Sequence, residues 1–367
     1  MRYGSPLQSI CRDAQDHGHI DLHKQERIPA FVTPPWWQGP QTHIDSAEKA
    51  RIVHEREASN AHNISIYTDG AKINGHVGAA AVRQGTGASK STYMGSEATA
   101  TTYVAELQGI DLALSMAEAE LESNPTKRQT VIWTDSQAAV QSLTRPEGRT
   151  GAYVLQRIVQ QVDSLHRRGH TVRVRWIPSH RDISGNKAAD KAAKEATGWR
   201  KDGSSGARAA AATEPYSQKA AVKMWYRKRV HERWETTWRG ETRGKAAYRY
   251  TAVPSKKVLQ LHQGLSKRQS SLLVQLRTEK IGLKDFLFRR KVPDITNPWC
   301  ACYEGRQTVR HVLLSCKNHR KLRQQELGRH PGPTNLRTIL TKRKLAIKAI
   351  RFMEQAQILG QNGIVEE

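Results

Sequence analysis

The chain has 367 residues, with 59 Lys and Arg against 34 Asp and Glu, and a formal net charge of +25. This length favours two or three domains over one small module. No stretch approaches the eighteen or so apolar residues of a membrane span, and the first residues lack the apolar run of a secretory signal. Four cysteines are too few for a disulfide scaffold, so we expect a reducing compartment. The positive charge predicts a polyanionic partner, with nucleic acid as the first candidate.

The charge is unevenly distributed along the chain. Residues 1–60 carry 7 basic and 8 acidic side chains, and residues 61–200 carry 17 and 13. Residues 201–367 carry 35 basic and 13 acidic side chains, so nearly all of the excess lies there. The middle segment therefore retains acidic residues within a basic chain, which raises the question of their role.

Four segments differ in pattern. Residues 1–60 have weak periodicity and contain Pro34-Pro35-Trp36-Trp37, which is typical either of an extended segment that packs through its aromatic side chains or of a flexible tail. Residues 61–200 have the pattern of an α/β domain. Residues 201–216 are small and polar, as in a flexible linker. Residues 217–367 are basic and predominantly helical in pattern.

The α/β segment predicts a mixed five-stranded sheet flanked by helices. Alternating or continuous apolar runs indicate strands near 64–68, 77–82, 90–94, 130–134 and 172–176. Helical spacing indicates a long helix through residues 107–121 and further helices at 136–144, 151–167 and 184–197. Beyond the linker, Trp234 and Trp238 stand four residues apart among arginines. Helices that bury tryptophans, a basic face toward phosphate, or both would produce this pattern.

Acidic residues stand where predicted strands and helices begin or end. Asp69 and Asp135 each follow a strand, Glu106 opens the long helix, and Asp190 lies in the last helix of the domain. If the two Asp-bearing strands are parallel neighbours, these two carboxylates meet at one sheet edge. Carboxylates held so close repel one another unless they bind hard divalent cations such as Mg²⁺. Two such ions support in-line attack on a phosphodiester.

Each acidic residue also has an ordinary structural interpretation. An Asp before Gly is common in turns, and Asp135 before Ser136 would serve as a helix cap. The ordered set on suitable elements favours a catalytic site over these separate interpretations. His180 follows the last strand, where a lone histidine is otherwise a hydrogen-bonded surface residue.

The same residues resemble the type 1 ribonucleases H over about residues 62–197. The resemblance rests on five short motifs: Tyr67-Thr68-Asp69-Gly70, Ala105-Glu106-Leu107, Thr134-Asp135-Ser136-Gln137, Trp176-Ile177-Pro178-Ser179-His180 and Gly185-Asn186-Lys187-Ala188-Ala189-Asp190. It implies the ribonuclease H fold and cleavage of the RNA strand of RNA–DNA hybrids. It places two Mg²⁺ or Mn²⁺ ions on Asp69, Glu106, Asp135 and Asp190, and makes His180 a mobile catalytic histidine.

The resemblance also carries expectations about substrate contacts. Gly70, Asn74, Gln108 and Ser136 would contact the hybrid, whose 2′-hydroxyl groups distinguish RNA from DNA. Lys187 departs from the family pattern, in which an acidic residue often stands at this position. Residues 136–170 also lack the lysine-rich excursion that some members use to bind substrate, so we expect substrate binding to rely on another part of the chain.

Three of the four cysteines lie close together near the C-terminus. Cys300, Cys302, His311 and Cys316 follow the spacing C-x-C-x₈-H-x₄-C within residues 300–316, and one His with three thiolates makes a tetrahedral zinc set. We therefore expect one structural Zn²⁺. The alternative is a group of buried thiols beside a packed histidine, and Cys11 has no assigned role.

The outer segments resemble the C-terminal part of non-LTR (LINE-type) retrotransposon polyproteins. The similar stretches are residues 277–287 with the following Cys/His motif, and Pro34-Pro35-Trp36-Trp37. The resemblance implies a role beside a reverse transcriptase and a nuclear or cytoplasmic location, although this chain has no Tyr/Phe-x-Asp-Asp polymerase motif. We expect hybrid and nucleic-acid backbone as partners, the latter through the basic region, and no membrane; the sequence does not predict the oligomeric state.

Two other functions compete with this interpretation. One is a catalytically inactive nucleic-acid-binding remnant of a retrotransposon polyprotein, which the complete carboxylate set argues against. The other is a transposase or resolvase, which the Thr134-Asp135-Ser136-Gln137 motif and the arrangement from His180 to Asp190 argue against.

Overall fold

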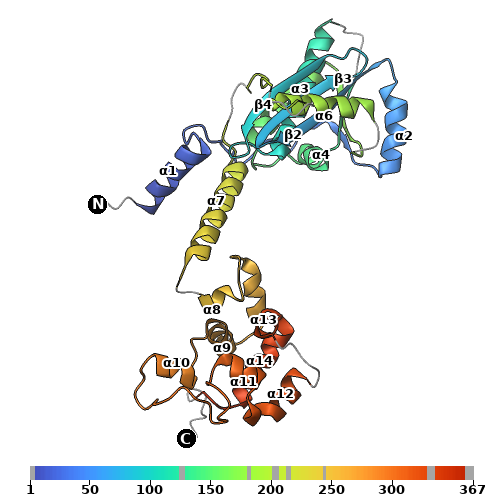
Figure 1. Cartoon of the computed structure of the whole chain (residues 1–367). Coiled ribbons are helices and arrows are strands. Elements are labelled where there is room, and N and C mark those ends of the chain that lie inside the picture. Colours follow the sequence, from blue (N-terminus) through green and yellow to red (C-terminus); the bar gives the residue numbers. More distant parts are fainter. Residues whose placement is uncertain are drawn as a thin grey trace. The chain divides into compact units, whose positions relative to one another are not determined.

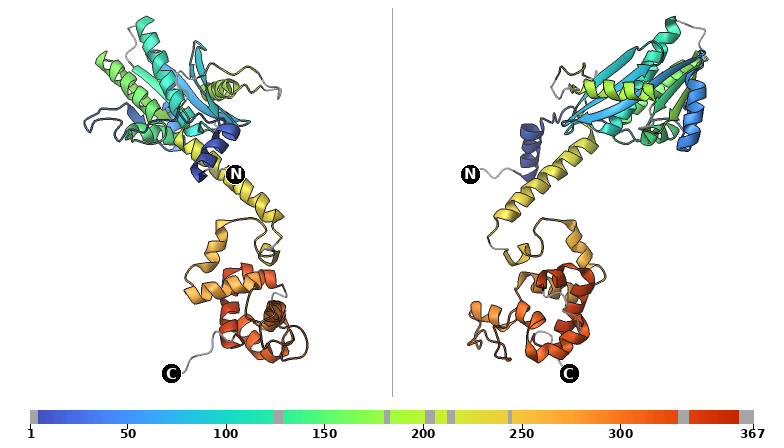
Figure 2. Two further views of the ribbon diagram at one scale, coloured as in Figure 1. Left: turned by 90° about the vertical axis from the view of Figure 1, so that its left-hand side faces the viewer. Right: turned by 45° about the vertical axis from the view of Figure 1, so that its right-hand side comes forward.

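The computed structural model describes residues 5–123, 129–179, 183–200, 206–211, 216–242, 245–328 and 335–359. The chain divides into two compact units, unit 1 (Met1–Lys228) and unit 2 (Arg229–Glu367) (Figures 1 and 2). His180 falls outside the described residues, so its predicted role has no structural counterpart here. Among the described helices, none combines the length and the apolar character needed to cross a bilayer.

Unit 1 is built on a mixed sheet with the strand order β1-β6-β5-β2-β3-β4. Three of these strands, β2, β3 and β4, are labelled in Figure 1. The prediction of a mixed α/β fold is confirmed, but the predicted number of five strands was wrong because a sixth strand, β1, pairs in parallel with β6. Only three residues form β1, too few for an alternating pattern. The strands are β1 (Gln41–His43), β2 (Asn63–Ile73), β3 (His76–Arg83), β4 (Ser89–Ser96), β5 (Gln129–Thr134) and β6 (Thr171–Trp176).

Helices cover both faces of this sheet. The helices α3 (Thr102–Ser123), α4 (Gln137–Thr144) and α5 (Ala152–Arg167) share one apolar core with alternate residues of β2, such as Ile64 and Ile66. On the opposite face, α6 (Ser184–Ala196) packs against Tyr67 and Trp133 through Ala189. Alternation along β2 therefore separates two cores and fixes which side each helix must occupy.

The N-terminal segment contains two helices that its weak periodicity did not indicate. Helix α1 (Pro6–Gly18) begins with a capping box at Ser5, and α2 (Ala47–Ala58) begins at Ser46, whose side chain accepts from the Lys49 backbone. The Trp37 indole donates a hydrogen bond to Asp163 on α5 at 2.9 Å, whereas Trp36 is 79% exposed. One of the two adjacent tryptophans thus joins this segment to the α/β core.

Residues 206–211 and 216–228 also contact the α/β core. The backbone N–H of Tyr93 in β4 donates to the Ala210 carbonyl at 3.0 Å, and Ser217 forms an isolated parallel bridge with Gln25. Helix α7 (Lys219–Gly240) follows directly. Its first turns pack Val222 and Trp225 against the cluster of Ala14, Ile20 and Ala98, so the start of α7 is anchored to unit 1.

Unit 2 is helical and has its own apolar core. The core draws on the η1, α9, α11, α13 and α14 helices, with Leu273, Val312 and Phe352 fully buried. Its elements are α8 (Lys245–Tyr248), η1 (Lys256–His262), α9 (Lys267–Thr278), α10 (Lys284–Arg289), α11 (Val309–Leu314), η2 (Lys317–His319), α12 (Arg320–Leu327), α13 (Leu336–Thr341) and α14 (Arg343–Gln355).

The Glu26 carboxylate joins three separate parts of unit 1, which predicts a measurable loss of stability when it is removed. It accepts a hydrogen bond from the Thr150 hydroxyl, and bonds of 2.7 Å from the backbone N–H groups of Gly151 and Lys219. We expect Glu26→Ala to lower the free energy of unfolding by about 2 kcal/mol, since three donors lose a charged acceptor. Urea denaturation measures this loss. An equal effect from Glu122→Ala, at an exposed position of α3, would contradict the assignment.

Candidate active site and metal centre

Asp69 and Asp135 lie side by side because their strands are parallel neighbours. β2 pairs with β5 up to Thr68 and Thr134, and each aspartate is the next residue along its strand. The expected meeting at one sheet edge therefore follows from the register. Asp135 is further held by two contacts: the Asn186 amide donates to its carboxylate at 3.4 Å, and the Trp176 indole donates to its backbone carbonyl at 3.0 Å.

Glu106 reaches the same edge because helix α3 crosses very close to β2. A Cβ atom built on Gly70 would lie 2.6 Å from the Glu106 backbone nitrogen, and one on Gly109 would lie 3.1 Å from the Ala80 carbonyl. A side chain at position 70 would therefore clash with the α3 backbone, and one at position 109 would be a tight fit, so these glycines permit the close approach of helix and sheet. The first turns of α3 can then present Glu106 next to Asp69.

The three carboxylates form one cluster, in which Asp69 and Glu106 are buried and Asp135 is half-buried. Each of Asp69, Glu106 and Asp135 offers an oxygen atom, and these atoms all lie within 4.8 Å of one another. Asp69 is 7% exposed and Glu106 is 8% exposed. One Glu106 oxygen, Oε2, is buried without a hydrogen-bond partner among the described residues. An unpartnered carboxylate oxygen within an all-oxygen donor set fits a hard divalent cation.

The electrostatics of the cluster also favour a bound cation. Burial and the nearby charges of Asp135 and Asp190 raise the pKa of Asp69 to about 7. Burial and the charges of Asp69 and Asp135 raise the pKa of Glu106 well above its ordinary value. The Gly70 backbone N–H lowers both pKa values but does not offset these effects. The ionised cluster is therefore unfavourable unless a cation compensates its charge.

Asp190 lies near this cluster but outside the closely spaced set of three. It comes from α6, and its charge contributes to the raised pKa of Asp69. Its carboxylate forms a 2.7 Å ion pair with Lys194, one turn further along the helix. The structure thus brings three of the four predicted carboxylates into ligand distance of one another and leaves Asp190 at the edge of the site.

Two predicted substrate residues occupy turns or helix ends. Asn74 has a positive φ of 50° in the hairpin turn between β2 and β3, and it lines a cavity of about 390 Å³ with His76 and Arg208. Ser136 is the N-cap of α4, where its side chain accepts a hydrogen bond from the Ala139 backbone. Their contacts with substrate stay predictions.

The other two predicted substrate residues are engaged inside the domain. Gly70 is packed beneath α3 as described above. Gln108 is buried, and its side-chain amide donates to Asp111 at 2.8 Å while its carbonyl accepts from Arg157 at 2.6 Å. Both ends of the Gln108 side chain are therefore hydrogen-bonded inside the domain. The spacing of residues in the sequence does not reveal this network.

Asn186 contacts the candidate site, although the sequence analysis did not predict it as a site residue. Its Nδ2 donates to Asp135, while its Oδ1 is buried without a hydrogen-bond partner among the described residues. This arrangement orients the Asp135 carboxylate toward the cluster. The signal available in the sequence was its position within the motif that precedes Asp190.

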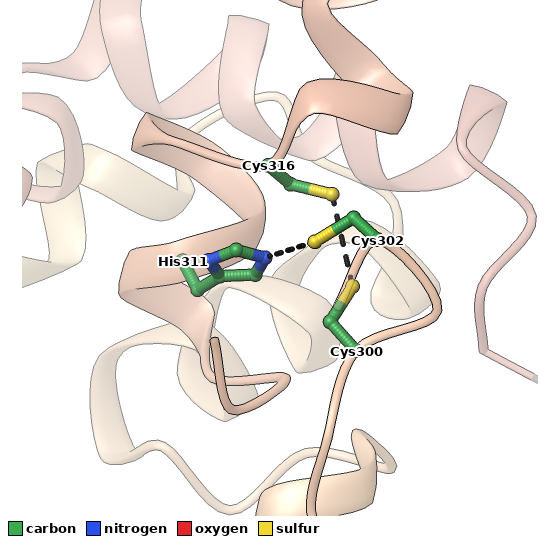
Figure 3. Close-up of side chains that lie close together, drawn as sticks. All are labelled: Cys300, Cys302, His311 and Cys316. Atoms are coloured by element: carbon green, nitrogen blue, oxygen red, sulfur yellow. Dashed lines mark hydrogen bonds between the residues drawn. The ribbon is translucent and has the colours of Figure 1, made fainter. Parts of the chain in front are cut away.

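The predicted Cys/His residues converge in unit 2 (Figure 3). The ligand atoms of Cys300, Cys302, His311 and Cys316 lie within 4.8 Å of one another. The two sulfur atoms of Cys300 and Cys316 are 3.7 Å apart, and the Cys302 sulfur lies 3.1 Å from Nε2 of His311. All four cysteines of the chain are free thiols, and these three are buried. The donor set is that of a structural metal site, and zinc prefers it.

Backbone contacts explain how the Cys/His residues come together. The Cys300 N–H donates to the Gly305 carbonyl at 2.9 Å, which closes the tight loop that carries Cys300 and Cys302. Thr308 caps α11, so His311 stands in its first turn, and the Cys316 N–H donates back to the His311 carbonyl at 2.8 Å. The loop thus contributes Cys300 and Cys302 to the site, and α11 with the turn after it contributes His311 and Cys316.

Mutual repulsion within the carboxylate cluster predicts a pH-dependent stability of the magnesium-free protein. Because folding raises the pKa of Asp69 from 3.8 to about 7, the folded state binds its proton more tightly, and stability falls as the pH rises through this range. We expect Asp69→Asn to flatten this slope and to stabilise the magnesium-free protein at pH 7.5 by about 2 kcal/mol.

Thermal melts between pH 4.5 and pH 7.5 measure this slope, with exposed Glu122→Gln as the matched control. Added Mg²⁺ should raise the melting temperature of the wild type and leave that of Asp69→Asn nearly unchanged. A variant less stable than the wild type at pH 7.5 without magnesium would contradict the electrostatic account.

Comparisons with known proteins give a family match and similar solved structures. Residues 61–198 match the family model of RNase H. No curated protein matches the chain. A solved structure of RNase H1 from the archaeon Halobacterium salinarum is 23% identical, with 36% of this chain and 96% of that chain covered and a TM-score of 0.27. The N-terminal RNase H domain of a Mycobacterium tuberculosis protein, solved as a fusion with maltose-binding protein, is 22% identical, with 37% and 98% covered and a TM-score of 0.29. The family match supports an RNase H domain at residues 61–198.

Proposed function

We propose that unit 1 hydrolyses the RNA strand of RNA–DNA hybrids at the cluster of Asp69, Glu106 and Asp135. The observation that carries the proposal is this closely spaced set of three carboxylates, with one Glu106 oxygen buried and unpartnered among the described residues, inside the segment that matches the RNase H model. The family match at residues 61–198 supports RNA-strand nuclease activity in general. The substrate, the metal requirement and the residue roles given below are our proposal.

The chain's own residues would prepare the site for a metal-dependent reaction. Oxygen atoms of Asp69, Glu106 and Asp135 would hold two Mg²⁺ or Mn²⁺ ions, and Asp190 would complete the set from α6. The chemistry that these ions supply when bound is activation of a water molecule and stabilisation of the leaving 3′ oxygen. Asn186 orients Asp135, and Lys194 keeps the charge of Asp190 compensated near the site. His180 would assist proton movement or product release.

The flanking regions would place this nuclease within a retrotransposon reverse-transcription machinery. The support is the resemblance of residues 34–37, 277–287 and 300–316 to LINE-type polyproteins. The basic C-terminal region would hold nucleic-acid backbone by charge, and this attraction should weaken steeply as salt rises. A Zn²⁺ ion on Cys300, Cys302, His311 and Cys316 would stabilise unit 2, since the donor set and the loop–helix geometry fit it.

Asp135→Asn tests the catalytic assignment. We expect hybrid cleavage to fall by more than about a hundredfold, because even residues that only orient metal ligands alter activity by ten- to a hundredfold. The melting temperature should not fall, since the change removes a repelling charge. The assay follows a labelled RNA strand annealed to DNA under a Mg²⁺ titration, with exposed Asp16→Asn as the matched control.

Three outcomes would count against the proposal. Equal cleavage by the wild type and Asp135→Asn would overturn the site assignment. Binding of hybrid without cleavage by the wild type at saturating Mg²⁺ would favour an inactive nucleic-acid-binding remnant instead. Cleavage of DNA duplexes that contain no RNA would revive the transposase alternative.

The zinc site is tested separately by native mass spectrometry. We expect one Zn²⁺ in the wild type and none after combined Cys300→Ser and Cys302→Ser substitution, because a site with two of its four ligands removed binds zinc poorly. Cys11→Ser, outside the cluster, is the matched control and should keep the ion. A wild-type protein purified with zinc available but without bound metal would end this proposal.

A further inference from the structure

Unit 2 contains an apolar pocket that neither the carboxylate site nor the Cys/His cluster uses. It has a volume of about 230 Å³ and lies between the last turns of α7, the segment through α8 and η1, and α9. Its lining is mainly aromatic and aliphatic, with one charged side chain. The residues that shape it are Trp234, Trp238, Pro254, Val258, Val274 and Arg277.

Two tryptophans form one side of this pocket. They lie four residues apart on α7 and therefore on the same face of the helix. The Trp238 indole donates a hydrogen bond of 2.7 Å to the Thr251 carbonyl, which fixes its ring against the pocket. Trp234 is 51% exposed, and Val274 on the other side is 49% exposed. The pocket thus offers large apolar and aromatic surfaces to solvent instead of burying them in the core of unit 2.

Arg277 places a positive charge beneath these surfaces. Its side chain is 7% exposed and donates to the Thr251 hydroxyl at 2.5 Å, while its guanidinium lies 5.9 Å from the centre of the Tyr250 ring. One terminal nitrogen is buried without a hydrogen-bond partner, and no described carboxylate forms an ion pair with it. A buried, uncompensated cation favours an occupant that carries negative charge or electron-rich groups.

Exposed basic side chains flank the pocket. Arg233 precedes Trp234 on α7, and Lys256 with Lys257 follows the pocket residue Ser255. None of these three has an ion-pair partner among the described residues. By contrast, Arg239 on the same helix pairs with Glu235 at 2.6 Å. Exposed cations next to the lining residues in the sequence, together with the aromatic lining, give this region two different kinds of attraction.

We propose that this pocket binds one unstacked base of a single-stranded nucleic acid, with Arg233, Lys256 and Lys257 on the adjoining phosphates. Indole rings stack on any base, so the pocket selects single strands, whose bases are free, over duplexes. The charge pattern favours this occupant over an apolar protein segment, which would leave Arg277 uncompensated and the neighbouring exposed cations without partners. This site is separate from the nuclease centre and does not depend on its activity.

The test compares two single-stranded DNA oligonucleotides of equal length and charge, because the proposed nuclease does not cleave DNA. One carries ordinary bases and the other carries abasic tetrahydrofuran sites, and fluorescence anisotropy measures the binding of each to the full chain. We expect the wild type to prefer the base-containing strand. Trp234→Ala should weaken binding of the base-containing strand by about fivefold to a hundredfold and leave binding of the abasic strand nearly unchanged.

Matched variants separate stacking from charge and from loss of fold. Trp234→Phe keeps an aromatic ring and should keep most of the preference, whereas Phe288→Ala, at another exposed aromatic residue of unit 2, should change nothing. Combined Lys256→Gln and Lys257→Gln should weaken both strands alike and reduce the salt dependence of binding. The proposal is overturned if Trp234→Ala keeps the wild-type preference for bases, or if the wild type binds both strands equally. Equal binding of the two strands would mean that charge alone holds the DNA. The pocket would then be left for another occupant, such as a protein segment.

Discussion

The close packing of α3 against β2 is the constraint on which the rest of unit 1 depends. Two glycines allow this approach: a Cβ atom on Gly70 of the strand would clash with the α3 backbone, and one on Gly109 of the helix would make a tight contact. This approach brings Glu106 to Asp69, while the register of β2 and β5 brings Asp135 to the same place. The fold therefore gathers three carboxyl groups at one site, where burial and the charges of neighbouring aspartates raise the pKa values of Asp69 and Glu106. Such a cluster destabilises the metal-free protein, and a divalent cation that relieves the repulsion would bind there and stabilise the fold.

The basic excess of the chain and its acidic site perform complementary tasks in this account. The carboxylate cluster accounts for part of the near balance of charge in the middle of the chain, where 13 acidic residues stand against 17 basic ones. Unit 2 combines a Cys/His cluster with a pocket of tryptophans above a buried arginine. In our proposal, one unit cleaves nucleic acid and the other holds it through charge and base stacking. The anchoring of the start of α7 by Glu26 gives the nuclease unit a defined end, where the α/β core continues into this helix.

The sequence predicted the features that follow from periodicity and from strand ends. Asp69 and Asp135 could be paired because each follows an apolar strand, and Glu106 could be added because its helix face carries the core residues. The motif spacing predicted the grouping of Cys300, Cys302, His311 and Cys316. Features that depend on long-range packing were not predictable. Strand β1 has three residues, Gln108 is engaged by Arg157 from another helix, and the pocket around Arg277 forms only when α7, η1 and α9 meet.

The central claim is that the carboxylates of Asp69, Glu106 and Asp135 form a binding site for divalent cations. The most direct test is crystallographic: crystals of the wild type grown with Mn²⁺ would be measured at a wavelength where manganese scatters anomalously. The account predicts an anomalous peak between these three side chains, at about 2.0–2.6 Å from their oxygens. Well-ordered carboxylates with no anomalous peak between them, in crystals that bind Mn²⁺ elsewhere, would contradict it.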